Sequence, residues 1–113
     1  MNNKEKETLK ESLLDYERNN EATWRGINYC IFMEQVTNRS DKEKALSKLE
    51  ECTNHTKTIA HLCNKLMVEL EKSTTDFACV KIYSKKIEHA NSQLNLLIED
   101  YRSLRKKPVE KED

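Results

Sequence analysis

The stretch Ala45–Leu70, ALSKLEECTNHTKTIAHLCNKLMVEL, decides the fold of this 113-residue chain. Apolar or neutral residues recur in it at alternating intervals of four and three, the heptad spacing that lines one face of an α-helix. A single amphipathic helix cannot bury its own stripe, so the spacing predicts a helix whose seam other helices must cover. The seam positions are Ala45, Leu49, Cys52, Thr56, Ile59, Cys63, Leu66 and Leu70.

The cysteines and histidines of this stretch raise the question of a metal or redox site. On a helix, Cys52 and Cys63 lie on one face but about 16 Å apart along the axis. A single zinc ion cannot bridge that separation, and a disulfide needs Cα atoms within about 7 Å. His61 points to nearly the opposite face from Cys52. His55 lies beside Cys52 and could bind a metal with it, but every further ligand would have to come from another helix. We interpret the cysteines as small apolar seam residues and predict no metal or other cofactor, with reversible thiol chemistry as a minor alternative.

Two further segments have helical spacing, and the breaks between segments differ in strength. In the segment TNRSDKEK, Ser40 and Glu43 fit the capping box that begins a helix, here at about Asp41. After Leu70 the heptad register slips at the STTD run, residues 73–76, whose residue types compete with helical hydrogen bonding. The slip favours a turn with two helices of about 45 Å over one continuous rod of about 100 Å. The last segment repeats the spacing at Tyr83, Ile87, Ala90, Leu94, Leu97, Tyr101 and Leu104.

The first segment is less regular than the other two. Leu9, Leu13 and Tyr16 begin a helical stripe that Asn19 and Asn20 interrupt. The run at residues 27–36 is too apolar for one face of an exposed helix, so we expect contacts on several sides, from its own bundle and from another chain. Gly26, inside this segment, indicates a bend or a close backbone contact.

Composition restricts the fold class to all-α. Only one glycine and one proline are present, too few for the turns of a β-rich fold. A net charge of zero argues against disorder. We expect a single helical domain over residues 1–107 and a polar tail at 108–113. Its long amphipathic heptad helices, at about 4–36, 41–73 and 76–106, should form either an antiparallel three-helix bundle or an extended coiled coil.

Several function classes are disfavoured by the same observations. The balanced charge predicts no nucleic-acid binding, and we interpret Arg102, Arg105, Lys106 and Lys107 as solvated cations at a helix carboxyl end. No glycine-rich loop or nucleophile arrangement is present, which predicts neither an enzyme nor a small-molecule substrate. The amino terminus lacks an apolar signal segment, and no window of eighteen apolar residues occurs, which predicts no membrane insertion. The expected compartment is the cytoplasm, with the nucleus as the alternative.

The function class that remains is protein–protein interaction through helices. We expect a non-enzymatic scaffold or adaptor subunit of a multiprotein coiled-coil assembly, bound to other helical proteins as a hetero-oligomer, with a homo-oligomer as the alternative. In layout the chain is similar to short coiled-coil subunits of tethering, trafficking and kinetochore assemblies. The competing hypothesis is a self-contained three-helix-bundle module that binds an amphipathic helix or peptide. The predicted partner contacts are Trp24, Ile27, Ile31, Phe32, Met33, Leu66, Leu70, Leu94, Leu97 and Tyr101.

Overall fold

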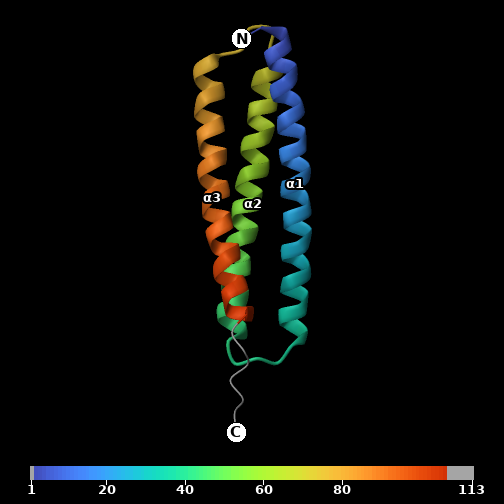
Figure 1. The fold of residues 1–113 in the computed structure, drawn as a ribbon, viewed down its shortest axis with the longest axis vertical. Helices are drawn as coiled ribbons and strands as arrows, with labels where there is room; N and C mark the ends of the chain where they lie inside the picture. Colours follow the sequence, from blue (N-terminus) through green and yellow to red (C-terminus); the bar gives the residue numbers. More distant parts are fainter. Residues whose placement is uncertain (1, 107–113) are drawn as a thin grey trace.

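The computed structural model describes residues 2–106, which form three long α-helices arranged side by side (Figure 1). Helix α1 spans Asn3–Val36, α2 spans Lys42–Glu71 and α3 spans Phe77–Lys106. The helices alternate in direction, and α2 lies between α1 and α3 (Figure 1). The predicted all-α class is therefore confirmed, and each helix begins and ends within two residues of its expected bounds. The tail predicted at 108–113 lies outside the described residues.

A turn at residues 72–76 excludes the extended rod and makes the structure an antiparallel bundle. Polar side chains of the turn supply hydrogen bonds that a continuous helix would have made along its backbone. The Glu69 carboxylate accepts from the backbone N–H of Asp76 at 2.8 Å, and the Thr75 hydroxyl donates to the Glu69 carbonyl at 3.3 Å. The Asp76 carboxylate accepts from the N–H of Ala78, in the first turn of α3, at 2.9 Å. The register slip at STTD thus corresponds to a true break.

Acid should weaken this turn through Glu69. A hydrogen-bonded ion pair with Lys72 at 2.7 Å, together with the N–H of Asp76, lowers the pKa of Glu69. A carboxyl with a lowered folded-state pKa stabilises the fold above its unfolded value of about 4.3, and that stability disappears as the pH falls through the folded-state value. We expect Glu69→Gln to lower the melting temperature at pH 7, and we expect its deficit relative to the wild type to shrink as the pH falls below the unfolded-state value of about 4.3.

Thermal unfolding followed by circular dichroism at pH 7, 5 and 3 measures this difference. Glu71→Gln, which changes an exposed carboxyl two residues further on, is the matched control and should leave the melting temperature unchanged at every pH. A difference between wild type and Glu69→Gln that stays the same at pH 3 would contradict the assignment.

Helix α2 forms the centre of the core. All eight of its predicted seam positions, from Ala45 to Leu70, are buried, so the heptad reading of this helix is confirmed. The polar member of the seam, Thr56, donates its hydroxyl proton to the Thr53 carbonyl at 2.7 Å, which removes the cost of burying an unpaired donor. The flanking helices cover α2 with Leu13 and Ile27 from α1, and with Val80, Ile87, Ala90 and Leu94 from α3.

Helix α1 continues without a break through the two asparagines that interrupt its apolar stripe. The side-chain amide of Asn20 donates to the Thr56 carbonyl of α2 at 3.0 Å, so this residue ties the two helices together. The close contact expected at Gly26 is absent among residues 2–106: a Cβ built there would meet no heavy atom of these residues within 4 Å.

The capping box predicted at Ser40 and Glu43 is not formed. Helix α2 begins at Lys42, its N-cap residue is Asp41, and no side chain makes a capping hydrogen bond. The carboxylate of Asp41 contacts Arg105 of α3 instead. A tertiary ion pair has therefore taken the place of the local cap that the sequence predicts.

Candidate interaction surface

The structure divides the ten predicted partner contacts into three groups by burial. Ile27, Leu66, Leu70 and Leu94 are buried in the bundle core, because α1 and α3 of the same chain cover the α2 seam. Those four side chains pack against other residues of the same chain, so they offer no exposed surface to a partner. Ile31, Leu97 and Tyr101 are partly buried against the core. Trp24, Phe32 and Met33 are exposed.

Exposed apolar side chains gather on the outer face of α1, near its carboxyl end. Tyr29, Phe32, Met33 and Val36, here called the outer stripe, are 40–65% exposed. Their spacing of i, i+3, i+4 and i+7 places them on one face of the helix. The core residue Ile27 lies on the opposite face, so α1 is apolar on two sides in this region.

The area of the outer stripe distinguishes it from isolated exposed residues. An aromatic side chain offers about 150–250 Å², so four side chains with this exposure present on the order of 400 Å² of apolar surface. Contiguous patches of a few hundred Å² commonly mark interaction sites. Outside α1, the exposed large apolar side chains among residues 37–106 are not spaced at three or four residues from one another: they are Val68, Phe77, Ile82 and Leu96.

Sequence reasoning missed Tyr29 and Val36 as members of this surface. From the apolar run at 27–36 it selected Ile27, Ile31, Phe32 and Met33. The signal that identifies Tyr29 and Val36 is their position three or four residues from Phe32 and Met33, which is visible in the sequence.

An open groove runs between α1 and α3 over the same part of the bundle. No Cα atom of α1 lies within 8 Å of a Cα atom of α3, so these two helices are further apart than either is from α2. The groove has a volume of about 480 Å³. Leu49 and Cys52 of α2 lie among its lining residues, with Thr23, Gly26, Ile27 and Cys30 from α1 and Asn95, Ile98, Glu99, Tyr101 and Arg102 from α3.

A second groove, of about 450 Å³, lies between α1 and α2. Trp24 and Ala60 contribute apolar surface to it, and Glu17, Glu21 and Lys57 contribute charge. Trp24 therefore lines a groove of its own chain while remaining 40% exposed.

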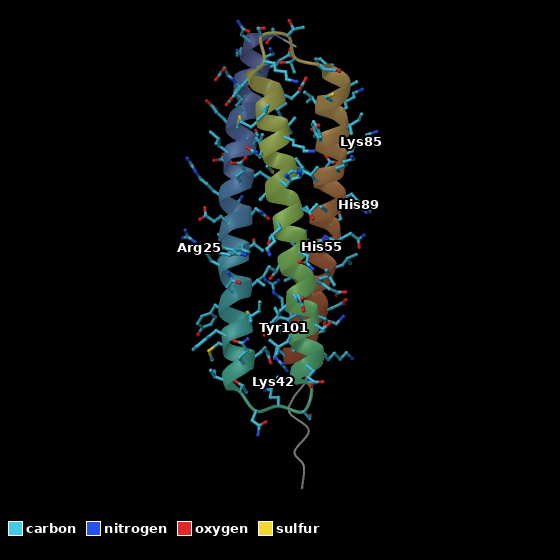
Figure 2. All side chains as sticks on the ribbon, turned by 180° about the vertical axis from the view of Figure 1, so that it is seen from behind. Arg25, Lys42, His55, Lys85, His89 and Tyr101 are labelled. Atoms are coloured by element: carbon cyan, nitrogen blue, oxygen red, sulfur yellow. The ribbon has the colours of Figure 1, made fainter. Side chains whose placement is uncertain are left out.

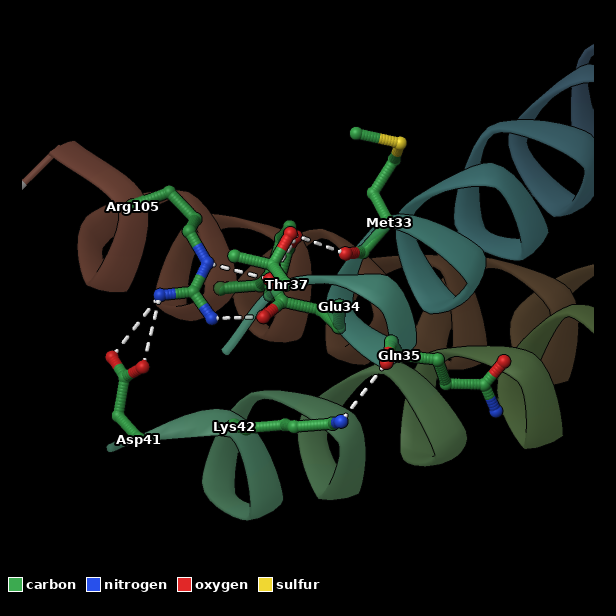
Figure 3. A network of polar contacts seen from close by, with 8 residues as sticks. Met33, Glu34, Gln35, Thr37, Asp41, Lys42 and Arg105 are labelled. Carbon is green, nitrogen blue, oxygen red and sulfur yellow. Dashed lines mark hydrogen bonds and ion pairs between the residues drawn. The ribbon is translucent and has the colours of Figure 1, made fainter. Parts of the chain in front are cut away.

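A polar network joins the three helices at the end of the bundle where α1 and α3 finish (Figure 3). Arg105 of α3 contacts Glu34 of α1 through both Nε, at 2.6 Å, and a terminal nitrogen. Its other terminal nitrogen lies 3.1 Å from the Asp41 carboxylate. The Tyr101 hydroxyl donates to Glu34 at 2.9 Å, and burial followed by this hydrogen bond raises the pKa of Tyr101 to about 12. The Arg105 guanidinium is thus a partly buried cation between two carboxylates, not the solvated helix-end charge that the sequence indicated.

The four cysteines are free thiols, and two of them belong to the core. Burial, followed by the charge of Glu51 for Cys52 and of Glu17 for Cys63, raises the pKa of both thiols to about 11, so they are protonated at neutral pH. Protonated buried thiols are poor nucleophiles and poor metal ligands.

None of the histidines is buried with Cys52 and Cys63: His55 on α2 is half-buried, and His61 on α2 and His89 on α3 are exposed (Figure 2). In the part of the chain that the structure describes, no three His, Cys, Asp or Glu side chains gather in a way that could hold a metal ion.

Within residues 2–106, no helix has the length and apolar character that crossing a bilayer requires.

Comparison with known proteins does not assign a family or a function to this surface. No protein-family model matches the sequence, and neither a curated protein nor a solved structure shows significant similarity to it.

Proposed function

We propose that this protein is a non-enzymatic helical scaffold or adaptor subunit of a multiprotein coiled-coil assembly in the cytoplasm, acting through helix–helix contacts. The observation that supports this function is the outer stripe of α1. The bundle buries its core without these four side chains, so folding of the chain does not explain why they are apolar. Covering them with another helix would remove about 400 Å² of apolar surface from water.

The spacing of the outer stripe indicates the kind of partner. Side chains at i, i+3, i+4 and i+7 form the face that a helix presents to another helix or to a helical groove. We therefore assign the partners to the class of helical proteins. Assemblies of the tethering, trafficking and kinetochore types use short helical subunits in this way.

A second candidate function, a recognition module for an amphipathic helix or peptide, is favoured by the α1/α3 groove. Its volume of about 480 Å³ accommodates a few large apolar side chains of a bound helix. The variant Asn95→Trp separates the two functions, because it fills the groove from α3 and leaves the outer stripe unchanged.

The proposed function predicts that charge on the outer stripe abolishes complex formation. The double variant Tyr29→Glu/Phe32→Glu changes two exposed positions, so its melting temperature should match that of the wild type. Tagged wild type and variant are purified from the native source, and co-purifying proteins are quantified by mass spectrometry. We expect recovery of the stoichiometric partners to fall at least tenfold, because two buried carboxylates would oppose the interface.

Leu96→Glu is the matched control, since Leu96 is equally exposed but lies on α3. It should leave partner recovery unchanged. The same set of partners recovered with the double variant would contradict the role of the outer stripe, and loss of partners only with Asn95→Trp would favour the recognition module.

A further inference from the structure

We propose that the chain forms an antiparallel homodimer through the outer face of α1, with Tyr29 on the two-fold axis. This inference rests on the proposed function, because it takes that face to be a protein-contact surface. It goes further by identifying the occupant as a second copy of the same chain and by fixing the direction and register of the two helices.

A second heptad seam on α1 carries the inference. Ala22, Gly26, Tyr29, Met33 and Val36, here called the outer seam, follow one another at intervals of four, three, four and three. All five are exposed in the bundle. The chain thus has a strict heptad stripe that none of its own helices covers, in addition to the one on α2.

The outer seam is complementary to itself when two copies run in opposite directions. With the axis at Tyr29, the small residue Ala22 of one copy faces the larger Val36 of the other. Gly26 faces Phe32 and lies one position from the residue opposite Met33, and Tyr29 faces its own symmetry mate. Small residues therefore oppose large ones on both sides of the axis, as an isologous two-fold interface requires.

Gly26 also lines the α1/α3 groove, but no contact among residues 2–106 requires a glycine there. A Cβ at this position would meet nothing within 4 Å, and its backbone dihedral φ is negative, so any residue could occupy it. Glycine is the poorest helix former after proline. Close approach of a second helix, with the Phe32 side chain of the other copy seated against a bare backbone, accounts for it.

Charge favours the antiparallel direction over the parallel one. Arg18 and Arg25 lie on the same outer face, and each forms its ion pair within α1, with Asp15 at 3.7 Å and with Glu21 at 2.8 Å. In a parallel dimer, Arg18 would face Arg18 and Arg25 would face Arg25. In the antiparallel register, Arg25 faces the neutral Met33, and Arg18 lies opposite position 40, which is beyond the end of α1 at Val36. Like charges therefore do not oppose each other.

The area of the interface predicts a weak, reversible dimer. The outer seam covers about 22 Å of helix, and a helix is about 10–12 Å across. Each copy therefore buries less than the roughly 800 Å² of a standard stable interface. We expect a dissociation constant in the micromolar range or above.

Sedimentation equilibrium between about 10 µM and 1 mM tests the association. The wild type should follow a reversible monomer–dimer equilibrium. Gly26→Gln and Tyr29→Glu should each raise the dissociation constant at least tenfold, while Leu96→Glu on α3 leaves it unchanged. Gly26→Gln is the cleaner variant because its side chain points into open space, so the monomer should melt at the wild-type temperature or higher.

Disulfide cross-linking in a Cys30→Ser background tests direction and register. Disulfides form only where Cα atoms approach within about 7 Å. Tyr29→Cys should cross-link to itself. Ala22→Cys and Val36→Cys should each fail alone and should form a mixed dimer when combined in equal amounts. The background protein alone is the control.

Three results would overturn the dimer: a monomer at every concentration, self-cross-linking of Ala22→Cys and Val36→Cys as in a parallel pair, or dissociation by Leu96→Glu. The two proposals fail separately. A monomeric protein whose Tyr29→Glu/Phe32→Glu variant still loses its co-purifying partners overturns the dimer alone. A dimer whose partner recovery is unaffected by that variant overturns the proposed function alone.

Discussion

Replacing Arg105 with methionine should destabilise the bundle by about 3–5 kcal/mol, because it removes the cation that neutralises a buried carboxylate. Glu34 is only 4% exposed, and the guanidinium that binds it is itself largely buried. In the variant, the Tyr101 hydroxyl would be the remaining side-chain donor to Glu34. A domain of this size is stable by about 5–15 kcal/mol, so chemical denaturation should show a large loss of the free energy of unfolding.

Arg102→Met is the control for this prediction, since it removes the same side chain three residues away. Arg102 pairs with Glu99 at 3.0 Å, but both side chains are 62% exposed. An exposed pair contributes about 0–1 kcal/mol, so this variant should unfold almost as the wild type does. Equal losses of unfolding free energy in Arg105→Met and Arg102→Met would show that burial of the Arg105 network contributes no stability.

The double variant Glu34→Leu/Arg105→Met distinguishes a buried unpaired charge from lost packing. Replacing both members of a buried ion pair with apolar residues is often neutral or stabilising, whereas removing one member is not. We expect the double variant to recover most of the stability lost in Arg105→Met. The difference between the single and double variants is the coupling energy of the pair.

The sequence predicted the core helix because its signal is local. Every seam position of α2, including Cys52, Thr56 and Cys63, is buried as the heptad spacing indicated. Helical period depends only on residues three and four positions apart, which are adjacent along the chain. The turn at 72–76 was also readable, because it coincides with both a register slip and a run of polar capping residues.

The Arg105 network could not be predicted in the same way. Glu34 and Asp41 lie 71 and 64 residues from Arg105 in sequence, and only the packed bundle brings them together. Local patterns assigned Arg105 to solvent and the start of α2 to a Ser40 capping box. Both readings were wrong, because a tertiary contact used Arg105 and Asp41 together.

Only part of the candidate surface could be predicted, because it too depends on how the helices pack. The sequence showed that residues 27–36 carry more apolar side chains than one helix face can hold. Which of them face the core depends on the rotation of α1 against α2, and α1 has the least regular stripe of the three helices. The structure supplies that rotation: Ile27 faces inward, and Tyr29 and Phe32 face outward.

The variant Ile59→Asp should abolish the folded bundle at neutral pH. Ile59 is fully buried near the middle of α2, within the core that both flanking helices cover. The substitution loses about 1.5–3 kcal/mol of apolar burial and adds the several kcal/mol of burying a charged carboxylate. The sum is comparable to the whole stability of a small domain. Circular dichroism should show a large loss of helical signal at pH 7.

Two comparisons test whether the effect of Ile59→Asp comes from a buried charge: its dependence on pH, and the same substitution at the neighbouring position 58. Burial raises the pKa of an introduced carboxyl, and its neutral form costs less in the core, so the deficit of Ile59→Asp relative to wild type should shrink as the pH falls from 7 towards 5. Thr58→Asp places the same charge one residue away on an exposed face, and should change stability by about 0.5 kcal/mol or less. Ile59→Val should cost only about 0.5–1.5 kcal/mol. Equal helicity in Ile59→Asp and Thr58→Asp at pH 7 would mean that α2 does not present this face to α1 and α3.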